Sequence, residues 1–539
     1  MSDINSESSL IGLALALGAE SIGEWHSGEI EIAKTATRVS SDQQRRVRGQ
    51  IEAGSDPLGE IFCALRTPVE RRESGATYTP KVIVKAMTQW ACQNVKPGRV
   101  IDAGVGSGRF LVAAGRAFTN ADLLGVELDP VAAIVARGHL AAAGLQKRAR
   151  IVLVDYRDLT LEASSKPTLF IGNPPYVRHH RIAPAWKKWL TSRAAEHGLG
   201  ASQLAGLHVY FFLATASLAK PGDAGVFITA AEWLDVNYGK LVRDLFLKRL
   251  GGQSIHLIEP TALPFADAAT TGVITCFKAG AVSSSVGVRT VASTDELKSL
   301  DTGRLVRRER LEVAPRWTPL LRSPRKAPEG FIELGELCSV HRGQVTGANH
   351  VWIEGAHSKG LPETVLFASV TKARDLLRAG RELADASILR RVIDLPASLD
   401  TLEAAERKVV ERFLKIARSM GGHKGYIARH RKAWWSIGLR GPAPILTTYM
   451  ARRSPAFVLN TAEARHINIA HGIYPREKMS STVLGALARY LNDSVSTHDG
   501  RTYAGGLTKF EPKEVERLLV PSIQLLANPS VGAPDPHLQ

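Results

Sequence analysis

The chain contains little cysteine for its length. Four cysteines occur among 539 residues: Cys63, Cys92, Cys276 and Cys338. They lie far apart and form no Cys-x-x-Cys pair, so the sequence indicates neither a zinc site nor a disulfide framework. This usage fits a reduced, cytoplasmic protein, and no metal is expected.

Long apolar stretches are also missing. No run of apolar residues is long enough to span a bilayer, so a membrane-embedded protein is not expected. The run from Leu10 to Leu17 follows acidic residues, not basic ones, and lacks a clear cleavage site. It therefore predicts a helix and not a signal peptide.

Acidic residues are outnumbered. The sequence has 69 Lys and Arg against 52 Asp and Glu, a formal net charge of +17. This balance favours a polyanionic partner, with nucleic acid first and an anionic membrane surface second. The hydrophobic and charged fractions, 44% and 22%, are ordinary for a globular protein. A chain of this length predicts two or three domains.

Glycines follow the first strand of a predicted α/β sheet. The strand 99–102 ends at Asp102 and runs into Gly104, Gly106 and Gly108, and a helix is expected from residue 109. Glycines in such a turn let the backbone bend tightly and approach a ligand. The pattern is weak alone, but the strand before it and the helix after it strengthen the prediction.

The next two predicted strands end in acids. Glu127 closes the second strand, where nucleotide-binding α/β folds place an acid on ribose hydroxyls, and its distance from the glycine loop fits the usual spacing. The third strand, 150–154, ends at Asp155 and Tyr156. Asp155 can accept a hydrogen bond from an exocyclic amine, and Tyr156 can pack on a purine ring.

The fourth predicted strand, 169–172, ends at Asn173, Pro174, Pro175 and Tyr176. Two prolines fix φ and remove two backbone donors, so the strand stops and the amide of Asn173 projects rigidly from its end. Tyr176 offers a flat face beside it. The four residues suit a site that accepts hydrogen bonds from an amino group and stacks a ring. Alone, they fit a proline-stopped loop with a surface tyrosine equally well.

A Thr-Pro pair precedes the glycine loop. Thr79 is predicted as a helix N-cap, with Pro80 at the first helical position of the run 81–90. Such a helix start can also seat a carboxylate. Further strands at 225–229, 254–258 and 272–278 extend the sheet. Ligands of open α/β sheets bind at the carboxyl ends of strands, where these polar residues gather.

Changes in composition predict the domain organisation. We expect an N-terminal helical segment over 1–70, a catalytic domain over 71–285, a Ser- and Pro-rich linker over 286–328, a second domain over 329–525 and a disordered tail over 526–539.

Basic and aromatic residues interleave in the second domain. Cationic side chains meet phosphates, whereas aromatic and amide groups meet bases. Surface charge combined with core tryptophan is the alternative for each cluster. The residues predicted to contact DNA are Arg342, Arg429, Arg431, Lys432, Arg452, Arg453 and Arg501.

In this order, the motifs resemble those of gamma-type DNA adenine-N6 methyltransferases, the class of the Taq enzyme, over roughly residues 55–525. The resemblance implies a class I methyltransferase fold, with a Rossmann-like doubly wound sheet and a C-terminal mixed α+β target-recognition domain. It implies S-adenosyl-L-methionine as cofactor and double-stranded DNA as substrate, methylated after base flipping. The enzyme would serve a restriction–modification system or act alone, and any DNA cleavage would need a separate restriction endonuclease.

The resemblance also implies roles for residues. Glu127 would bind the cofactor ribose, Asp155 its adenine amine, and Tyr156 would lie against its ring. Thr79 and the glycine loop (Gly104, Gly106 and Gly108) would hold the methionine part, with Asp102 beside it. Tyr78 and Pro80 belong to the implied cofactor-binding set as well. The implied catalytic set is Asn173, Pro174, Pro175 and Tyr176, with Tyr238 as a second aromatic residue.

Two alternatives stay open at the sequence level. The same acceptor geometry suits any planar amine, so an RNA base or a protein glutamine amide is a possible target. Such enzymes generally lack a recognition domain of this size. A non-catalytic DNA-binding specificity subunit is the other alternative, and the presence of every expected catalytic residue argues against it.

Overall fold

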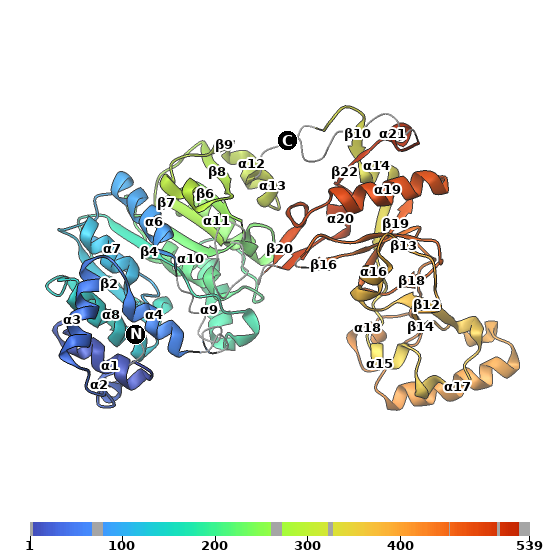
Figure 1. Ribbon diagram of the computed structural model, residues 1–539, viewed down its shortest axis with the longest axis horizontal. Coiled ribbons are helices and arrows are strands. Elements are labelled where there is room, and N and C mark those ends of the chain that lie inside the picture. Colours follow the sequence, from blue (N-terminus) through green and yellow to red (C-terminus); the bar gives the residue numbers. More distant parts are fainter. Residues whose placement is uncertain are drawn as a thin grey trace. The chain divides into compact units, whose positions relative to one another are not determined.

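The chain forms two compact units. The computed structural model describes residues 4–66, 70, 79–259, 272–321, 327–451, 453–503 and 507–527. Within them, the first unit holds residues 4–321 and Tyr503, and the second holds 327–502 and 507–527. Figure 1 shows the elements of both units along the chain.

A nine-stranded sheet forms the centre of the first unit. Its strand order is β3-β2-β1-β4-β5-β7-β6-β8-β9. The first five strands of this order are parallel, and β7 runs antiparallel to both of its neighbours. The strands are β1 (Arg99–Asp102), β2 (Asp122–Glu127), β3 (Ala149–Leu153), β4 (Thr168–Gly172), β5 (Ala224–Ala230), β6 (Gly252–Ile258), β7 (Gly272–Lys278), β8 (Ser285–Val291) and β9 (Arg304–Arg307).

Helices cover both faces of this sheet. Residues of α6 (Lys81–Asn94), α7 (Arg109–Ala117) and α8 (Pro130–Ala142) share one hydrophobic cluster with one face of the strands. Residues of α9 (Pro184–Glu196), α10 (Leu207–Leu218) and α11 (Lys240–Lys248) share another cluster with the opposite face. Strands buried on both faces need continuous apolar runs, and β4 and β5 are buried along their whole length. The predicted doubly wound α/β fold is confirmed.

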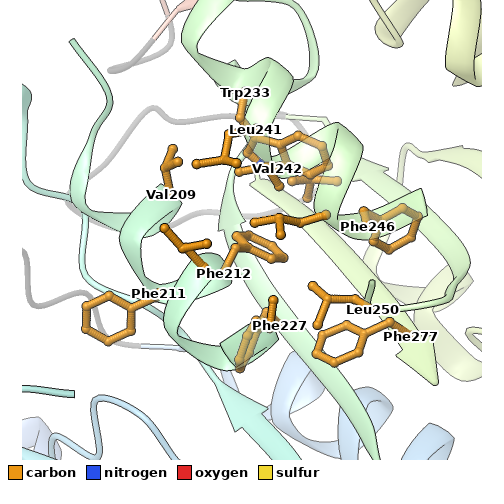
Figure 2. Packing of buried hydrophobic residues seen from close by; sticks show 14 of the residues in the cluster. Val209, Phe211, Phe212, Phe227, Trp233, Leu241, Val242, Phe246, Leu250 and Phe277 are labelled. Atoms are coloured by element: carbon orange, nitrogen blue, oxygen red, sulfur yellow. The ribbon is translucent and has the colours of Figure 1, made fainter. Parts of the chain in front are cut away.

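Aromatic side chains fill the core beneath α10 and α11. Figure 2 shows Phe212 between Phe227 and Trp233. The Phe212 ring lies 5.6 Å from that of Phe227 and 5.9 Å from that of Trp233, in edge-on and tilted geometries. Such pairs add to the free energy gained by burying their area. This cluster supports the side of the sheet that carries α10.

We expect Phe212→Leu to lower the free energy of unfolding of the first unit by about 1–2 kcal/mol, because the smaller side chain leaves a void between two rings. Phe212 is fully buried. Denaturant unfolding followed by tryptophan fluorescence measures the change. Val282→Ala is the control, since Val282 is 85% exposed and its loss should cost less than about 0.5 kcal/mol. Equal stability of the two variants would contradict this account of the core.

Four N-terminal helices pack on the outer side of α8: α1 (Glu7–Ala16), α2 (Ser27–Ala33), α3 (Ser41–Glu52) and α4 (Pro57–Leu65). Leu10, Ile51 and Leu58 meet Ile134 and other apolar residues of α8 in one buried cluster. The helical character predicted for this segment is confirmed.

The predicted linker over 286–328 is wrong for its described part. Residues 285–291 and 304–307 form β8 and β9, followed by α12 (Arg308–Val313) and α13 (Thr318–Leu321). Alternate residues Val286, Val288 and Val306 are buried against the sheet. Trp317, fully buried, packs its ring 5.9 Å from that of Trp233. The serines and prolines between these apolar positions mark turns and not a free linker.

The second unit has mixed α+β character, as predicted. A five-stranded sheet has the order β11-β19-β15-β17-β13, and a three-stranded sheet has the order β14-β12-β18. Smaller sheets pair β10 with β22, and β21 with β16 and β20. The strands are β10 (Phe331–Glu333), β11 (Cys338–Arg342), β12 (Leu366–Val370), β13 (Glu382–Leu383), β14 (Arg390–Ile393), β15 (Ile445–Thr448), β16 (Met450–Ala451), β17 (Phe457–Asn460), β18 (Arg465–His466), β19 (Ala470–Pro475), β20 (Arg501–Tyr503), β21 (Leu507–Lys509) and β22 (Leu519–Pro521).

Helices α17 (Ala404–Ser419) and α19 (Ser481–Ser494) are the long helices described in this unit. The shorter ones are α14 (Leu334–Leu337), α15 (Asn349–Trp352), α16 (Ala373–Ala379), α18 (Tyr426–Arg429), α20 (Pro512–Val515) and α21 (Ile523–Ala527). Leu526 and Ala527, predicted to begin the disordered tail, end α21, and the rest of that prediction lies outside the described residues. Among the helices described in either unit, none has the length and apolar character needed to cross a bilayer.

Candidate functional site

A cavity of about 370 Å³ lies where β1 to β4 end at their carboxyl side. This is the edge at which open parallel sheets bind ligands. The cavity brings together residues from four separate strand ends, as the sequence predicted. Eight of the predicted residues line the cavity: Thr79, Gly104, Gly106, Glu127, Asp155, Tyr156, Asn173 and Pro175.

Asn173 is held in place by a side-chain hydrogen bond. Its Nδ2 donates to the Oγ1 of Thr79 over 3.0 Å. The backbone carbonyl of Thr79 in turn accepts a hydrogen bond from the guanidinium of Arg109, at the start of α7. An amide whose nitrogen is engaged in this way has a fixed orientation, so its oxygen faces a defined direction.

Thr79 is not the N-cap of the following helix, which corrects the sequence prediction. Helix α6 begins at Lys81, and its N-cap is Pro80, without a side-chain cap hydrogen bond. The helix starts one residue later than predicted, so Thr79 lies one position before the cap. Its hydroxyl is instead available to Asn173, at 5% exposure of the residue.

Asp102, the last residue of β1, is fully buried and is not among the described residues that line the cavity, although Ala103 and Gly104 after it are. Its Oδ1 accepts a 3.4 Å hydrogen bond from the Gly104 amide, whereas Oδ2 is buried and has no hydrogen-bond partner among the described residues. Burial, aided by the negative charge of Glu127, raises the pKa of Asp102 to about 8. A Cβ on Gly172 would lie 2.5 Å from Oδ1, so only glycine fits where β4 passes this carboxyl group.

Glu127 joins the second strand to the glycine loop. Its Oε2 accepts from the Gly106 amide over 2.9 Å, and its Oε1 accepts from the amides of Leu128 and Asp129 at 2.9 and 3.1 Å. Burial nevertheless raises the pKa of this carboxyl group. Gly106 has φ of +51°, a left-handed conformation that places its amide toward Glu127.

Asp155 and Tyr156 follow β3 with different surroundings. Arg157 donates to both carboxylate oxygens of Asp155, at 2.8 and 2.5 Å. Tyr156 is 2% exposed, its hydroxyl lies 2.9 Å from the Thr215 hydroxyl, and burial raises its pKa. Its ring stacks on Phe211, with centroids 5.1 Å apart. Both residues still line the cavity.

The two tyrosines predicted to stack on a target base occupy different places. Tyr176 follows Pro175 at the cavity edge and is partly buried, and burial raises the pKa of its hydroxyl. Tyr238 lies in a 3-10 turn, Asn237–Gly239, and its hydroxyl donates to Glu232 over 2.5 Å. Neither is among the described residues that line the cavity.

The remaining predicted residues of the first unit lie next to the cavity and not on its wall. Pro80 caps α6, Gly108 caps α7, and Pro174 is buried. Tyr78 lies outside the described residues.

The basic residues predicted to contact DNA have different surroundings in the second unit. Arg342, in β11, lies 5.5 Å above the Tyr449 ring. Arg431 is partly buried and donates to the Val345 carbonyl, so it is engaged within the unit. The exposed members are Arg342, Arg429, Lys432 and Arg453. Arg452 lies outside the described residues, and only the backbone of Arg501, in β20, is described.

Comparison with known proteins decides the family. The type II methyltransferase M.XamI of Xanthomonas campestris pv. amaranthicola is 48% identical over 534 residues, covering 97% of this chain and 99% of that protein. The chain belongs to the type II restriction–modification DNA methyltransferases. The family described as Eco57I restriction-modification methylase matches residues 123–259, and the family described as the C-terminal domain of type II methyltransferase M.Eco57I matches residues 319–534.

More distant relatives agree with this family. The type II methyltransferase M.AccI of Acinetobacter calcoaceticus is 21% identical over 85% of this methyltransferase and 87% of its own length. Among solved structures, the type IIL restriction-modification enzyme MmeI in complex with DNA has a TM-score of 0.55 at 13% identity, covering 95% of this chain and 80% of that one. At that identity the likeness shows the fold alone. The resemblance seen in the sequence is confirmed at the level of a restriction–modification DNA methyltransferase.

The cofactor of this methyltransferase is S-adenosyl-L-methionine, and the cavity suits its chemistry. The carboxylate of Asp102 is buried behind Ala103 and Gly104 of the cavity wall, where a cationic group in the cavity would favour its ionised form. The carboxylate of Glu127 reaches the cavity wall, where a ribose diol can donate to it. Apolar walls from Phe110, Val126 and Phe211 suit a purine ring.

Several cavity residues were missed by sequence reasoning. Phe211 lies within an apolar helix that gives no sign of which residues face a ligand. Phe62, Cys63 and Arg66 of the N-terminal segment also line the cavity, brought there by tertiary packing. No local pattern in the sequence could have identified them.

A basic strip directly after the Asn-Pro-Pro-Tyr motif was missed although its signal was present. The sequence from residue 163 to residue 195, which includes this motif, contains no Asp or Glu. Its lysines, arginines and histidines are all exposed or partly exposed. We name as the basic strip the residues Arg178, His179, His180, Arg181, Lys187 and Lys188.

Proposed function

We propose that this methyltransferase modifies N6 of adenine in double-stranded DNA after flipping the base out of the duplex. The observation that carries the proposal is the position of Asn173. It stands at the end of β4, on the wall of the cavity that suits the cofactor, and is followed by two prolines and Tyr176. A base inside a duplex cannot enter such a site without leaving its stack.

The residues of this chain act mainly by orientation. The Asn173 Oδ1 and the Pro174 carbonyl accept hydrogen bonds from the adenine amine, because the bond to Thr79 leaves Nδ2 facing the other way. Pro175 holds the motif rigid. With its hydrogens held, the amine nitrogen turns its lone pair toward the cofactor, and correct alignment supplies much of the rate. Bound S-adenosyl-L-methionine would supply the electrophilic methyl group, whose bond to sulfur breaks as the bond to nitrogen forms, with the electron pair left on the sulfur.

The proton balance needs no strong general base. Formation of the new nitrogen–carbon bond leaves N6 with one proton too many and a positive charge. That nitrogen is acidic, so the proton passes to solvent. Tyr176 stacks on the flipped base and returns part of the few kcal/mol that unstacking costs. Tyr238, in the turn Asn237–Gly239, is the second aromatic residue of the proposal, and its hydroxyl donates to Glu232.

The cofactor roles follow the cavity wall. The ribose meets Glu127, the adenine amine meets Asp155, and the adenine ring lies by Tyr156 and Phe211. The methionine part lies by Thr79 and the glycine loop, above Asp102. Within a restriction–modification system, a separate endonuclease would cut unmodified DNA.

Each unit, taken by itself, carries exposed cations that suit the phosphates of DNA. In the second unit these are the exposed Arg342, Arg429, Lys432 and Arg453, and in the first unit the basic strip. Val177 lines the cavity and Arg178 follows it directly, so the strip begins at the cavity edge. Phosphates flanking a flipped nucleotide lie close to that nucleotide, which suits cations at this place.

Sequencing that detects modified bases, applied to DNA from cells with and without the gene, tests the function. We expect N6-methyladenine in one sequence context that disappears with the gene. Purified enzyme with labelled cofactor should label duplex DNA. Label found only in RNA or protein, or a methyl group on cytosine, would overturn the proposal.

Removing two charges of the basic strip should weaken DNA binding in a salt-dependent way. We test this with the double variant Arg178→Ala and Lys188→Ala, because both side chains are exposed. The plot of log affinity against log salt concentration should become less steep, by about 0.9 for each phosphate contact that is lost. Affinity should fall for all sequences alike, because phosphate contacts do not read bases.

The matched control removes two exposed charges elsewhere in the same unit, Arg46→Ala with Lys147→Ala. Fluorescence anisotropy with labelled duplexes across a salt series measures both. An unchanged slope in the strip variant, or an equal change in the control, would show that the strip does not touch the DNA backbone.

A further inference from the structure

A buried carboxylate of the N-terminal segment touches the glycine loop. Asp56 is the N-cap of α4 and accepts a 2.8 Å hydrogen bond from the Gly59 amide. It is only 6% exposed. An N-cap needs no more than one such bond, and a solvent-facing aspartate would suffice for it. A buried carboxylate such as that of Asp56 needs additional hydrogen-bond or charged partners to offset the loss of water.

Those partners come from the glycine loop and the helices beside it. Ser107 donates to Asp56 Oδ2 over 2.6 Å, and Arg109 donates to the same oxygen over 3.0 Å. His139 of α8 lies 3.4 Å from Oδ1, and its Nδ1 is also 2.8 Å from the Ser107 carbonyl. Asp56 thus holds a serine, an arginine and a histidine around the loop.

Charge keeps this carboxylate ionised despite its burial. Burial alone would raise the pKa of Asp56, but His139, Arg109 and the hydrogen bonds from Ser107 and Gly59 hold it below its ordinary value. An ionised acceptor makes stronger hydrogen bonds than a neutral one. Asp56 is therefore a firm anchor for the groups bonded to it.

The same contacts lead to the proposed catalytic residue. Arg109 bonds Asp56 on one side and the Thr79 carbonyl on the other. The Thr79 hydroxyl accepts from Asn173. A continuous chain of hydrogen bonds thus runs from Asp56 to Asn173 through two residues that line the cavity.

The helix that Asp56 caps also forms part of the cavity wall. Phe62, Cys63 and Arg66 face the cavity from α4 and its C-terminal end. The Arg66 guanidinium lies 4.4 Å from the Phe62 ring centre and forms ion pairs with Glu7 and Asp129. This wall lies next to Leu128 and Asp129, the residues that follow Glu127.

We propose that the N-terminal segment is an integral part of the cofactor site, in which Asp56 is a positioning residue for the glycine loop and α4 forms one wall. The inference rests on the proposed place of S-adenosyl-L-methionine in this cavity. Asp56 touches neither cofactor nor substrate and acts through Ser107 and Arg109. A loop that is fixed before binding loses less conformational freedom when the ligand binds.

The variant Asp56→Asn tests this role with little change in volume. Asparagine is as good an N-cap as aspartate, so α4 keeps its start. It carries no charge, and its single carbonyl oxygen must serve Ser107, Arg109 and Gly59 together. We expect the dissociation constant of S-adenosyl-L-methionine to rise about tenfold in calorimetry and the KM for the cofactor to rise similarly. The affinity for DNA should stay within about twofold.

The control is Arg46→Ala, on exposed surface of the same segment, which should leave cofactor binding unchanged. A folded Asp56→Asn protein that binds the cofactor as tightly as the unmodified protein would overturn the inference. Failure of the unmodified protein to bind S-adenosyl-L-methionine would instead overturn the proposed placement of the cofactor.

Hydrogen exchange of the unmodified full chain gives a test that does not depend on a variant. Adding S-adenosyl-L-methionine should slow exchange at least about fivefold in 57–65, together with the glycine loop. Protection of the loop without protection of α4 would show that the N-terminal segment is not part of the site.

Discussion

Replacing Asn173 with alanine should lower the rate of methyl transfer about a thousandfold, while cofactor affinity should stay within about threefold. The expected size follows from the loss of an oriented polar group at the reacting atom, which typically costs a factor of a hundred to a thousand. The variant also loses the hydrogen bond from Asn173 to Thr79, which lowers the rate further because that bond holds the backbone around residue 173 in place. The effect should fall on kcat, since the acceptor acts on the reacting amine.

Single-turnover assays with labelled cofactor and a duplex substrate measure the rate, and calorimetry measures cofactor binding. Asn120→Ala is the control, because Asn120 is exposed in the same unit and should be without effect. A rate for Asn173→Ala within about tenfold of the unmodified enzyme would remove Asn173 from the reaction. Equal loss of cofactor binding would assign it a structural role instead.

The affinity for S-adenosyl-L-methionine should rise about fiftyfold between pH 6 and pH 8. Asp102 has its pKa raised to about 8 without ligand, because it is buried and lies near Glu127. A cationic ammonium or sulfonium group beside it favours the ionised form and lowers that pKa. Below pH 8 the ligand must therefore displace a proton, and affinity falls about tenfold for each pH unit. Above pH 8 Asp102 is already ionised and this dependence ends.

Calorimetry in buffers of different ionisation enthalpy measures the released proton directly. We expect about one proton per cofactor bound at pH 6 and about half of one near pH 8. Asp102→Asn should abolish the release and flatten the pH dependence. Asp122→Asn, at an exposed position in β2, should retain both. Affinity that does not change from pH 6 to pH 8 in the unmodified protein would show that Asp102 does not meet a cation.

Features coded by short stretches of sequence were predictable. The strand ends at Asp102, Glu127 and Asn173 were found because an apolar run followed by glycine, acid or proline defines both the strand and its last residue. Parallel strands place such ends along one edge. The gathering of these residues around one cavity therefore followed from local patterns and a single rule of sheet topology.

Features created by distant contacts were not predictable. Asp56 meets Ser107 across 51 positions, and nothing near Asp56 distinguishes it from an ordinary helix cap. Thr79 was predicted to cap a helix because its surroundings match a cap, yet the hydroxyl is bonded to Asn173, 94 positions away. In both cases a tertiary partner competes with the local motif and determines where the side chain lies.

Composition misled the prediction between the two units. Serine and proline suggested a linker over 286–328, whereas Val286, Val288 and Val306 are buried strand residues. Strand β8 pairs with β6 in parallel and with β9 in antiparallel. The alternation of buried and less buried residues in β8 covers only seven residues, so it gives a weak strand signal. The prolines that follow it in the sequence favoured the prediction of a linker.

The burial of Trp317 against Trp233 indicates where the chain can be divided between its two units. A chain cut at residue 285 would strip β8 and β9 from the sheet, leave the edge of β6 unpaired, and uncover two tryptophans. Open edges and exposed apolar surface favour aggregation. A cut after Leu321 keeps this cover with the catalytic unit. Hybrids that join the first unit of this chain to the second unit of a relative should therefore change parent after α13, and not at the serine-rich stretch that the sequence suggests.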